Sequence, residues 1–191
     1  RGLDIHTMTA SEISGVPLEK VTPELRRKAK TLNFGILYGM GGRALGEAAN
    51  ISRDEARVFI EEYFQKFKGI ANFIAHTKDF LRTHGYAQTA FGRKRFFPDI
   101  VSTNFRIQRE VERQAVNHPI QGTAADIMKK AMIGVHDFIK NRMLVDKVRL
   151  LLQIHDELLF EVGDAVSENV IMEIRKIMEE VWRGRVKMKV E

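Results

Sequence analysis

Residues 148–162, VRLLLQIHDELLFEV, predict a β-hairpin with acidic residues at its turn. Apolar side chains recur at every second position before the turn and again after it, which is the pattern of two half-buried strands. Asp156 and Glu157 fall where the strands meet, although carboxylates are poor strand formers. Two interpretations stay open: an ordinary polar turn, or rigidly held carboxylates that bind Mg²⁺ shared with substrate phosphates.

Residues 22–39, TPELRRKAKTLNFGILYG, predict a helix that runs to about Tyr38. Thr22 is a plausible N-cap and Pro23 suits the first helical position. Gly39, followed by two further glycines, is expected to end the helix.

This helix carries a surface stripe that grades from cationic to aromatic. Its members are four residues apart: Arg26, Lys30, Phe34 and Tyr38. Each step of four drifts by about 40°, so all four side chains share one face. Cations suit a polyphosphate and aromatic faces suit a base, and Gly35 would let a flat ligand approach closely. The alternative is a solvated basic helix start followed by core aromatics.

The two segments together resemble the nucleotide-binding fingers helix and the catalytic palm hairpin of family A DNA polymerases, the DNA polymerase I type. The fingers pattern is matched by Arg26, Lys30, Phe34, Gly35, Tyr38 and Gly39, and the palm pattern by His155, Asp156 and Glu157. Three more segments resemble the family: residues 4–7 (DIHT), 90–95 (AFGRKR) and 113–126 (RQAVNHPIQGTAAD).

The resemblance implies that a primer 3′-hydroxyl attacks the α-phosphate of a dNTP, with two Mg²⁺ ions as cofactors. It implies that Asp156 and Glu157 bind metal, and that His155 contacts the primer end. An ordinary turn histidine remains the alternative for His155.

The resemblance also implies which residues bind the dNTP. His6, Arg26 and Lys30 would hold the triphosphate, with Lys30 also donating a proton to the departing pyrophosphate. Phe34 would pack on the sugar and base, and Tyr38 would stack at the templating position. For His6, a loop histidine before a helix remains the alternative.

Primer–template DNA is the expected macromolecular partner. Arg113, Asn117 and Gln121 resemble residues that touch the minor groove, where acceptors are common to every base pair. Arg93 and Arg95 are expected to contact backbone phosphates. Helix capping around Pro119 remains the alternative for Asn117 and Gln121, and Asp126, near a helix start, receives no catalytic role. 

Composition supports a polyanionic partner and excludes several classes of protein. The 191 residues include 31 Lys and Arg against 25 Asp and Glu, with the basic residues clustered at 26–30, 93–95 and 106–113. No cysteine is present, which excludes disulfide frameworks and thiolate metal sites and fits a cytoplasmic or nucleoid-associated protein. The sequence contains no apolar run that is long enough to suggest a membrane span.

The expected fold is helix-rich α+β: fingers helices plus part of a polymerase palm with an antiparallel hairpin. The expected elements are helices at 22–38, 52–67, 70–83, 103–117, 123–141 and 166–182, with hairpins at 86–97 and 148–162. Because the pattern changes near Pro98, we expect a fingers subdomain over residues 1–102 and the C-terminal part of a palm over 103–191.

Two functional hypotheses follow. The first is template-directed DNA synthesis, with the chain a polymerase fragment lacking a preceding strand with a second metal-binding Asp and the thumb, and inactive alone. The second is a non-catalytic DNA-binding module that retains the polymerase fold.

Overall fold

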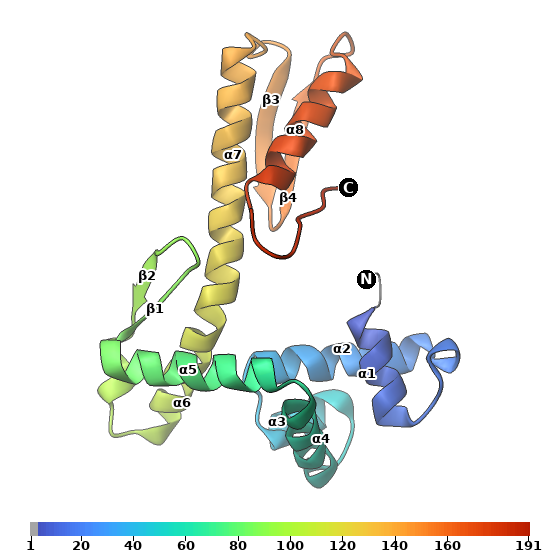
Figure 1. Ribbon diagram of the computed structural model, residues 1–191, viewed down its shortest axis with the longest axis vertical. Coiled ribbons are helices and arrows are strands. Elements are labelled where there is room, and N and C mark those ends of the chain that lie inside the picture. The colour runs from blue at the N-terminus through green and yellow to red at the C-terminus, as the bar shows by residue number, and fades with distance from the viewer. Residues whose placement is uncertain (1–3) are drawn as a thin grey trace. The chain divides into compact units, whose positions relative to one another are not determined.

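A computed structural model describes residues 4–191 and divides into two compact units (Figure 1). Unit 1 contains the chain up to Gln88 together with Lys94–Pro119, and unit 2 contains Thr89–Arg93 and Ile120–Glu191. Helices predominate, and each of the two described sheets is an antiparallel pair of strands. The predicted helix-rich α+β class is therefore confirmed.

Unit 1 is built mainly of helices. Its elements are α1 (Ile5–Ser14), α2 (Pro23–Leu37), α3 (Gly42–Ala49), α4 (Arg53–Lys66), α5 (Lys68–His84), β1 (Tyr86–Gln88), β2 (Lys94–Phe96) and α6 (Phe105–Asn117), with short 3₁₀ turns at Leu18–Lys20 and Pro98–Val101.

Local signals in the sequence set the ends of these helices. The Thr22 hydroxyl accepts a hydrogen bond from Leu25 N at 3.2 Å, and Pro23 is the first residue of α2, as predicted. Ser52 and Glu55 form the reciprocal capping box expected at the start of α4. Gly39, with φ of 72°, follows the C-cap of α2 in the left-handed conformation that glycine adopts without strain.

The core that positions α2 lies between α2, α3 and α4. It contains Leu32, Ile36, Leu45, Ala49, Ala56 and Tyr63. Gly35 faces this core, and a Cβ there would overlap the Leu45 side chain of α3. The expectation that Gly35 admits a flat ligand is therefore wrong: its missing side chain lets two helices pack closely.

Helix α6 belongs to unit 1, so the compact units do not divide near residue 102 as expected. Val111 and Ala115 of α6 share a core with Leu81, Ala87 and Phe97, which come from α5, β1 and the segment after β2. Because this packing joins α6 to the preceding helices, the units divide at Pro119. The functional assignment of residues 1–102 as fingers and 103–191 as palm stays a prediction.

The expected break at Pro119 is a π-helical segment, His118–Gly122, which joins α6 to α7 (Thr123–Asn141). A proline ring clashes with the preceding turn of an α-helix, and the wider π turn relieves that clash. The chain therefore continues through Pro119 in a helical conformation.

Unit 2 contains the acidic hairpin, with β3 (Val148–Ile154) and β4 (Glu157–Val162), beside α7 and α8 (Glu168–Glu180) (Figure 1). The strands pair antiparallel with Ile154 opposite Glu157, so His155 and Asp156 form a two-residue turn. The buried side chains that join hairpin and helices are Val135, Ile139, Val148 and Ile174. The predicted hairpin is confirmed.

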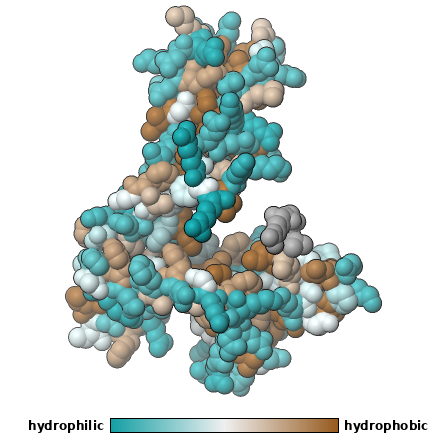
Figure 2. Space-filling model, in the orientation of Figure 1, coloured by the Kyte–Doolittle hydropathy of each residue, from teal (hydrophilic) through white to brown (hydrophobic). Residues whose placement is uncertain are grey.

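On the face shown in Figure 2, hydrophilic side chains cover much of each unit, and hydrophobic side chains are interspersed among them. Between residues 4 and 191, no helix is both long and apolar enough to cross a membrane.

Candidate functional site

The predicted stripe lies on the surface of unit 1. Arg26 and Lys30 are exposed, Phe34 is 39% exposed and Tyr38 is half-buried. The Phe34 and Tyr38 rings stack with centroids 6.0 Å apart and an angle of 11° between their planes, and Lys30 Nζ lies 5.9 Å from the Phe34 centroid. The alternative of core aromatics is therefore excluded for Phe34, and cation and rings form one continuous surface.

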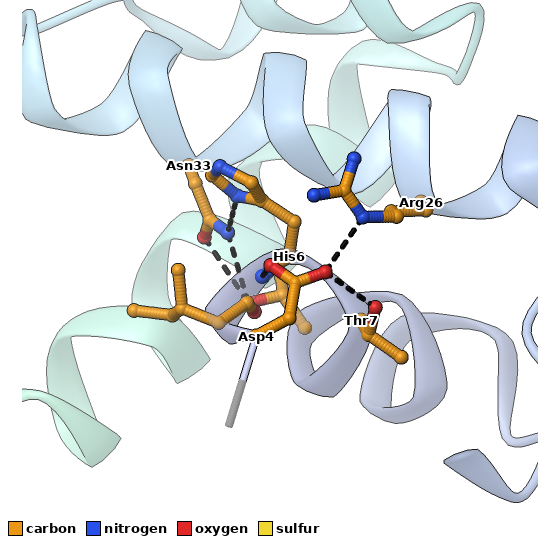
Figure 3. Close-up of polar contacts among 7 residues, drawn as sticks. Asp4, His6, Thr7, Arg26 and Asn33 are labelled. Carbon is orange, nitrogen blue, oxygen red and sulfur yellow. Dashed lines mark hydrogen bonds and ion pairs between the residues drawn. The ribbon is translucent and has the colours of Figure 1, made fainter. Parts of the chain in front are cut away.

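Asp4 holds the first cation of the stripe in place. Its carboxylate accepts hydrogen bonds from Arg26 Nε and from the Thr7 hydroxyl, both at 2.6 Å, and from His6 N at 3.2 Å, where it caps α1. Figure 3 shows Asp4, at the start of α1, between Thr7 of the same helix and Arg26 of α2. The hydrogen bond from Arg26, followed by that from Thr7, holds the pKa of Asp4 well below its usual range.

This ion pair predicts a pH-dependent contribution to folding. A carboxyl whose pKa is lowered by folding stabilises the protein above its ordinary pKa, here 3.8, and loses that contribution as the pH falls toward the lowered value. The free energy of unfolding of wild type should exceed that of Asp4→Asn at neutral pH, and the difference should shrink below about pH 4. Asparagine still caps the helix, so the comparison isolates the charge.

Denaturant titrations of both proteins across this pH range provide the measurement. Unfolding free energies that fall in parallel would show that the Asp4–Arg26 pair contributes nothing to stability.

His6 lies in the first turn of α1, which contradicts the alternative of a loop histidine. Its ring centroid is 5.5 Å from that of Phe34, and its Nδ1 lies 3.1 Å from the side-chain nitrogen of Asn33. Sequence reasoning had assigned no role to Asn33. The available signal was its position seven residues after Arg26, slightly less than two turns, which puts a polar group at the edge of the stripe.

The hairpin turn in unit 2 presents its carboxylates to solvent. His155, Asp156 and Glu157 are all exposed, and His155 has a left-handed φ of 55° that makes the tight turn possible. Carboxylate oxygens are the ligands that Mg²⁺ prefers. No cluster of three or more potential ligand residues occurs within residues 4–191.

Arg93 has an internal partner that the sequence did not reveal. Its Nε donates to Asp126 Oδ1 at 2.7 Å and its Nη2 donates to the Gly122 carbonyl at 3.0 Å, while Ala90 N donates to the Thr123 hydroxyl at 2.9 Å. Although burial raises the pKa of Asp126, hydrogen bonds from Thr89 and Arg93 outweigh it and lower that pKa. These contacts fix the turn between β1 and β2 against the start of α7.

Breaking this pair should destabilise the protein. The Asp126 side chain is only 11% exposed, so Asp126→Asn leaves an arginine with a weakened partner and should lower the free energy of unfolding by about 1–2 kcal/mol. Thermal and denaturant unfolding provide the measurement. Asp137→Asn, an exposed change on the same helix, is the control, and equal losses in both variants would contradict a structural role for the pair.

The remaining predicted DNA-contact residues lie in β2, α6 and the π-helical segment. Arg113 lines a cavity of about 350 Å³ together with Arg106 and Arg109, and its Nη2 donates to Glu110 at 2.5 Å. Arg95 donates to the Gln114 side chain at 2.8 Å. Asn117 is half-buried and Gln121 is exposed, and their contacts with DNA stay predictions.

The structure thus has two candidate sites: an exposed stripe of cations and aromatic rings on α2, and a hairpin turn with two exposed carboxylates. The sequence model that represents the family "DNA polymerase family A" matches residues 1–191. The chain therefore belongs to that family.

The relatives agree with this assignment. The chain is 46% identical over 191 residues to DNA polymerase I of Deinococcus radiodurans, covering 100% of the chain and 20% of the relative. It is 43% identical over 189 residues to DNA polymerase I of Rhizobium leguminosarum, covering 99% and 19%. The chain thus spans about a fifth of the length of these relatives.

A solved structure has the same fold. It is the POL domain of Pol1 from M. smegmatis in complex with DNA primer-template and dNTP, and the match has a TM-score of 0.90 at 40% identity. It covers 98% of this chain and 33% of the other.

Proposed function

We propose that the chain takes part in template-directed DNA synthesis, in which a dNTP is transferred to a primer 3′-hydroxyl. The observation that carries the proposal is the exposed surface of α2, where Arg26, Lys30, Phe34 and Tyr38 follow one another from cation to ring. The Pol1 structure with primer-template and dNTP supports the choice of ligands.

The cationic end of the stripe suits the triphosphate. Asp4 engages Nε of Arg26, and neither Nη group has a hydrogen-bond partner among residues 4–191, so both remain available to phosphate oxygens. Lys30 adds a second charge one turn along the helix. Positive charge beside the departing pyrophosphate stabilises it as the bond between the α-phosphorus and the bridging oxygen breaks. We assign to Lys30 the donation of a proton to that leaving group.

The aromatic end of the stripe suits the sugar and base. The exposed face of Phe34 offers an apolar surface to the incoming nucleotide, and its stacking on Tyr38 fixes the ring from the other side. Tyr38 would then stack at the templating position.

The ring of Phe34 gives a prediction about sugar discrimination. Phe34→Tyr should let dideoxynucleotides compete much better with normal dNTPs, by about 10²-fold or more, because a phenol hydroxyl supplies the interaction that the missing 3′-hydroxyl would have made. Competitive single-nucleotide incorporation measures the ratio. Phe59→Tyr, a change on α4 outside the stripe, is the control, and an unchanged ratio in Phe34→Tyr would remove Phe34 from the sugar pocket.

Asp156 and Glu157 would hold Mg²⁺ at the hairpin turn, with His155 beside the primer end. When bound, Mg²⁺ neutralises developing phosphate charge and lowers the pKa of the attacking hydroxyl. Strand pairing that runs up to Ile154 and Glu157 holds the turn with the two carboxylates at the end of the hairpin.

Duplex DNA would contact the basic residues of α6 and the β1–β2 hairpin. Arg113, Asn117 and Gln121 would reach the minor groove, and Arg95 and Arg93 the phosphates. Since Arg93 donates to Asp126 and Gly122, its Nη1 is the nitrogen that the internal contacts do not use. Phosphate contacts of this kind weaken strongly with salt.

Primer extension with Mg²⁺, and with EDTA as the metal-free control, separates this proposal from the alternative of a non-catalytic DNA-binding module. The polymerase that contains this chain should extend a labelled primer only with Mg²⁺. Tight binding of primer–template without any extension would favour the alternative.

A further inference from the structure

The network that holds His6 contains a buried amide with no partner outside the site. Asn33 is 2% exposed and sits on the face of α2 whose other buried side chains include Leu32 and Ile36. A buried amide is costly unless its hydrogen bonds are made. Its described partners are only His6 and Thr9, both on α1 (Figure 3).

The contacts of Thr9 determine which way the Asn33 amide points. Thr9 Oγ1 lies 2.8 Å from the Ile5 carbonyl oxygen and 3.2 Å from the Asn33 amide oxygen, and its one hydroxyl proton can be donated to only one of them. With the proton on the shorter contact, to Ile5, Thr9 Oγ1 acts toward Asn33 as an acceptor. The Asn33 nitrogen is the nearer amide atom, 3.0 Å from Thr9 Oγ1 against 3.2 Å for the amide oxygen. One N–H of Asn33 therefore points to Thr9, and the other points to His6.

The same amide determines the tautomer of His6. Asn33 Nδ2 is a donor and lies 3.1 Å from His6 Nδ1, so this contact is a hydrogen bond only if Nδ1 accepts and carries no proton. In the neutral ring the proton is then on Nε2. The ring is also held by Phe34 at 5.5 Å, so Nε2–H is left as a hydrogen-bond donor with a fixed direction.

We propose that Asn33 is a positioning residue that fixes His6 in the Nε2-protonated tautomer, so that Nε2–H donates to the triphosphate of the incoming dNTP. The proposal rests on the proposed function. A triphosphate oxygen can only accept, so the opposite tautomer would present it with a lone pair and repel it. Together with Arg26, whose guanidinium Asp4 holds, His6 becomes a preset donor before substrate arrives.

The tautomer can be measured directly by two-bond ¹H–¹⁵N correlation spectra of the 191-residue chain with labelled histidines, recorded at about pH 8, above the ordinary pKa of histidine. His6→Gln assigns the signal. Wild type should show the Nε2–H pattern. Asn33→Asp, which keeps the shape but accepts where the amide donated, should move the proton to Nδ1, and Asn33→Leu should give a mixture. Ser11→Ala, a change on α1 that removes the hydrogen bond from Ser11 Oγ to the Val16 carbonyl, lies outside this network and should leave the pattern unchanged.

Kinetics of the complete polymerase test the consequence. Asn33→Leu should raise the dNTP KM by about tenfold with a smaller effect on kcat. In a His6→Gln background the same change should have no further effect, because Asn33 acts through His6. Ser11→Ala, matched in its loss of one hydrogen bond on α1, should leave KM near wild type.

The outcomes separate the two proposals. An Nδ1–H pattern in wild type, or an Nε2–H pattern that persists in both Asn33 variants, would overturn the role of Asn33. If the spectra behave as expected but His6→Gln leaves dNTP kinetics unchanged, the tautomer assignment stands and the triphosphate role of His6 is wrong. If Asn33→Leu does not fold, Asn33→Asp decides.

Discussion

Asp156→Ala should abolish nucleotide addition by the polymerase that contains this chain while leaving its affinity for primer–template largely intact. The carboxylate is exposed in a two-residue turn closed by the pairing of Ile154 with Glu157, where we propose that it binds metal. Loss of a ligand removes charge stabilisation in the transition state, and we expect a fall of more than about 10³-fold, or about 4 kcal/mol. Because the side chain contributes little to the core, the fold should persist.

Single-turnover primer extension gives the rate, and a gel-shift titration gives the DNA affinity. Asp164→Ala is a matched control, since Asp164 is an exposed aspartate of the same unit beyond the end of β4. Extension by Asp156→Ala within tenfold of wild type would exclude Asp156 as a metal ligand.

Lys30→Ala and Arg26→Ala should raise the dNTP KM and lower the rate. Each removes a charge-assisted contact with the triphosphate, and we expect losses in kcat/KM of about 10²–10³-fold for Lys30 and somewhat less for Arg26. Lys30 should have the larger effect on kcat because it serves the leaving group. Asp4→Asn should resemble a mild form of Arg26→Ala, since it frees the guanidinium without removing it.

Arg27→Ala provides the control for charge alone. Arg27 is an exposed cation of the same helix, turned about 100° from Arg26 around the axis. If Arg27→Ala and Lys30→Ala change the dNTP kinetics equally, the stripe is a general electrostatic surface and not a site with defined contacts.

The sequence allowed accurate prediction of features that depend on neighbouring residues. The limits of α2 follow from Thr22, Pro23 and Gly39, and the hairpin follows from alternation on both sides of Asp156. The stripe on α2 needs only helical geometry, which is why its exposure could be anticipated.

Features that depend on contacts between residues far apart in the sequence could not be predicted from local patterns. Asp4 and Arg26 are 22 residues apart and Arg93 and Asp126 are 33 apart, so no local pattern pairs them. The prediction that Gly35 admits a flat ligand was wrong because the side chain that occupies this space, Leu45, comes from another helix. Which compact unit contains α6 depends on distant contacts too, since α6 packs on residues from α5, β1 and the segment after β2.

The central claim is that the chain serves a polymerase whose product is chosen by a template. The most direct measurement supplies the four dNTPs one at a time to the polymerase on primer–templates that differ only in the next templating base. The account predicts that, with Mg²⁺, the added nucleotide is the complement of that base and changes whenever the base is changed. Addition of the same nucleotide on every template, or DNA binding without addition, would contradict it.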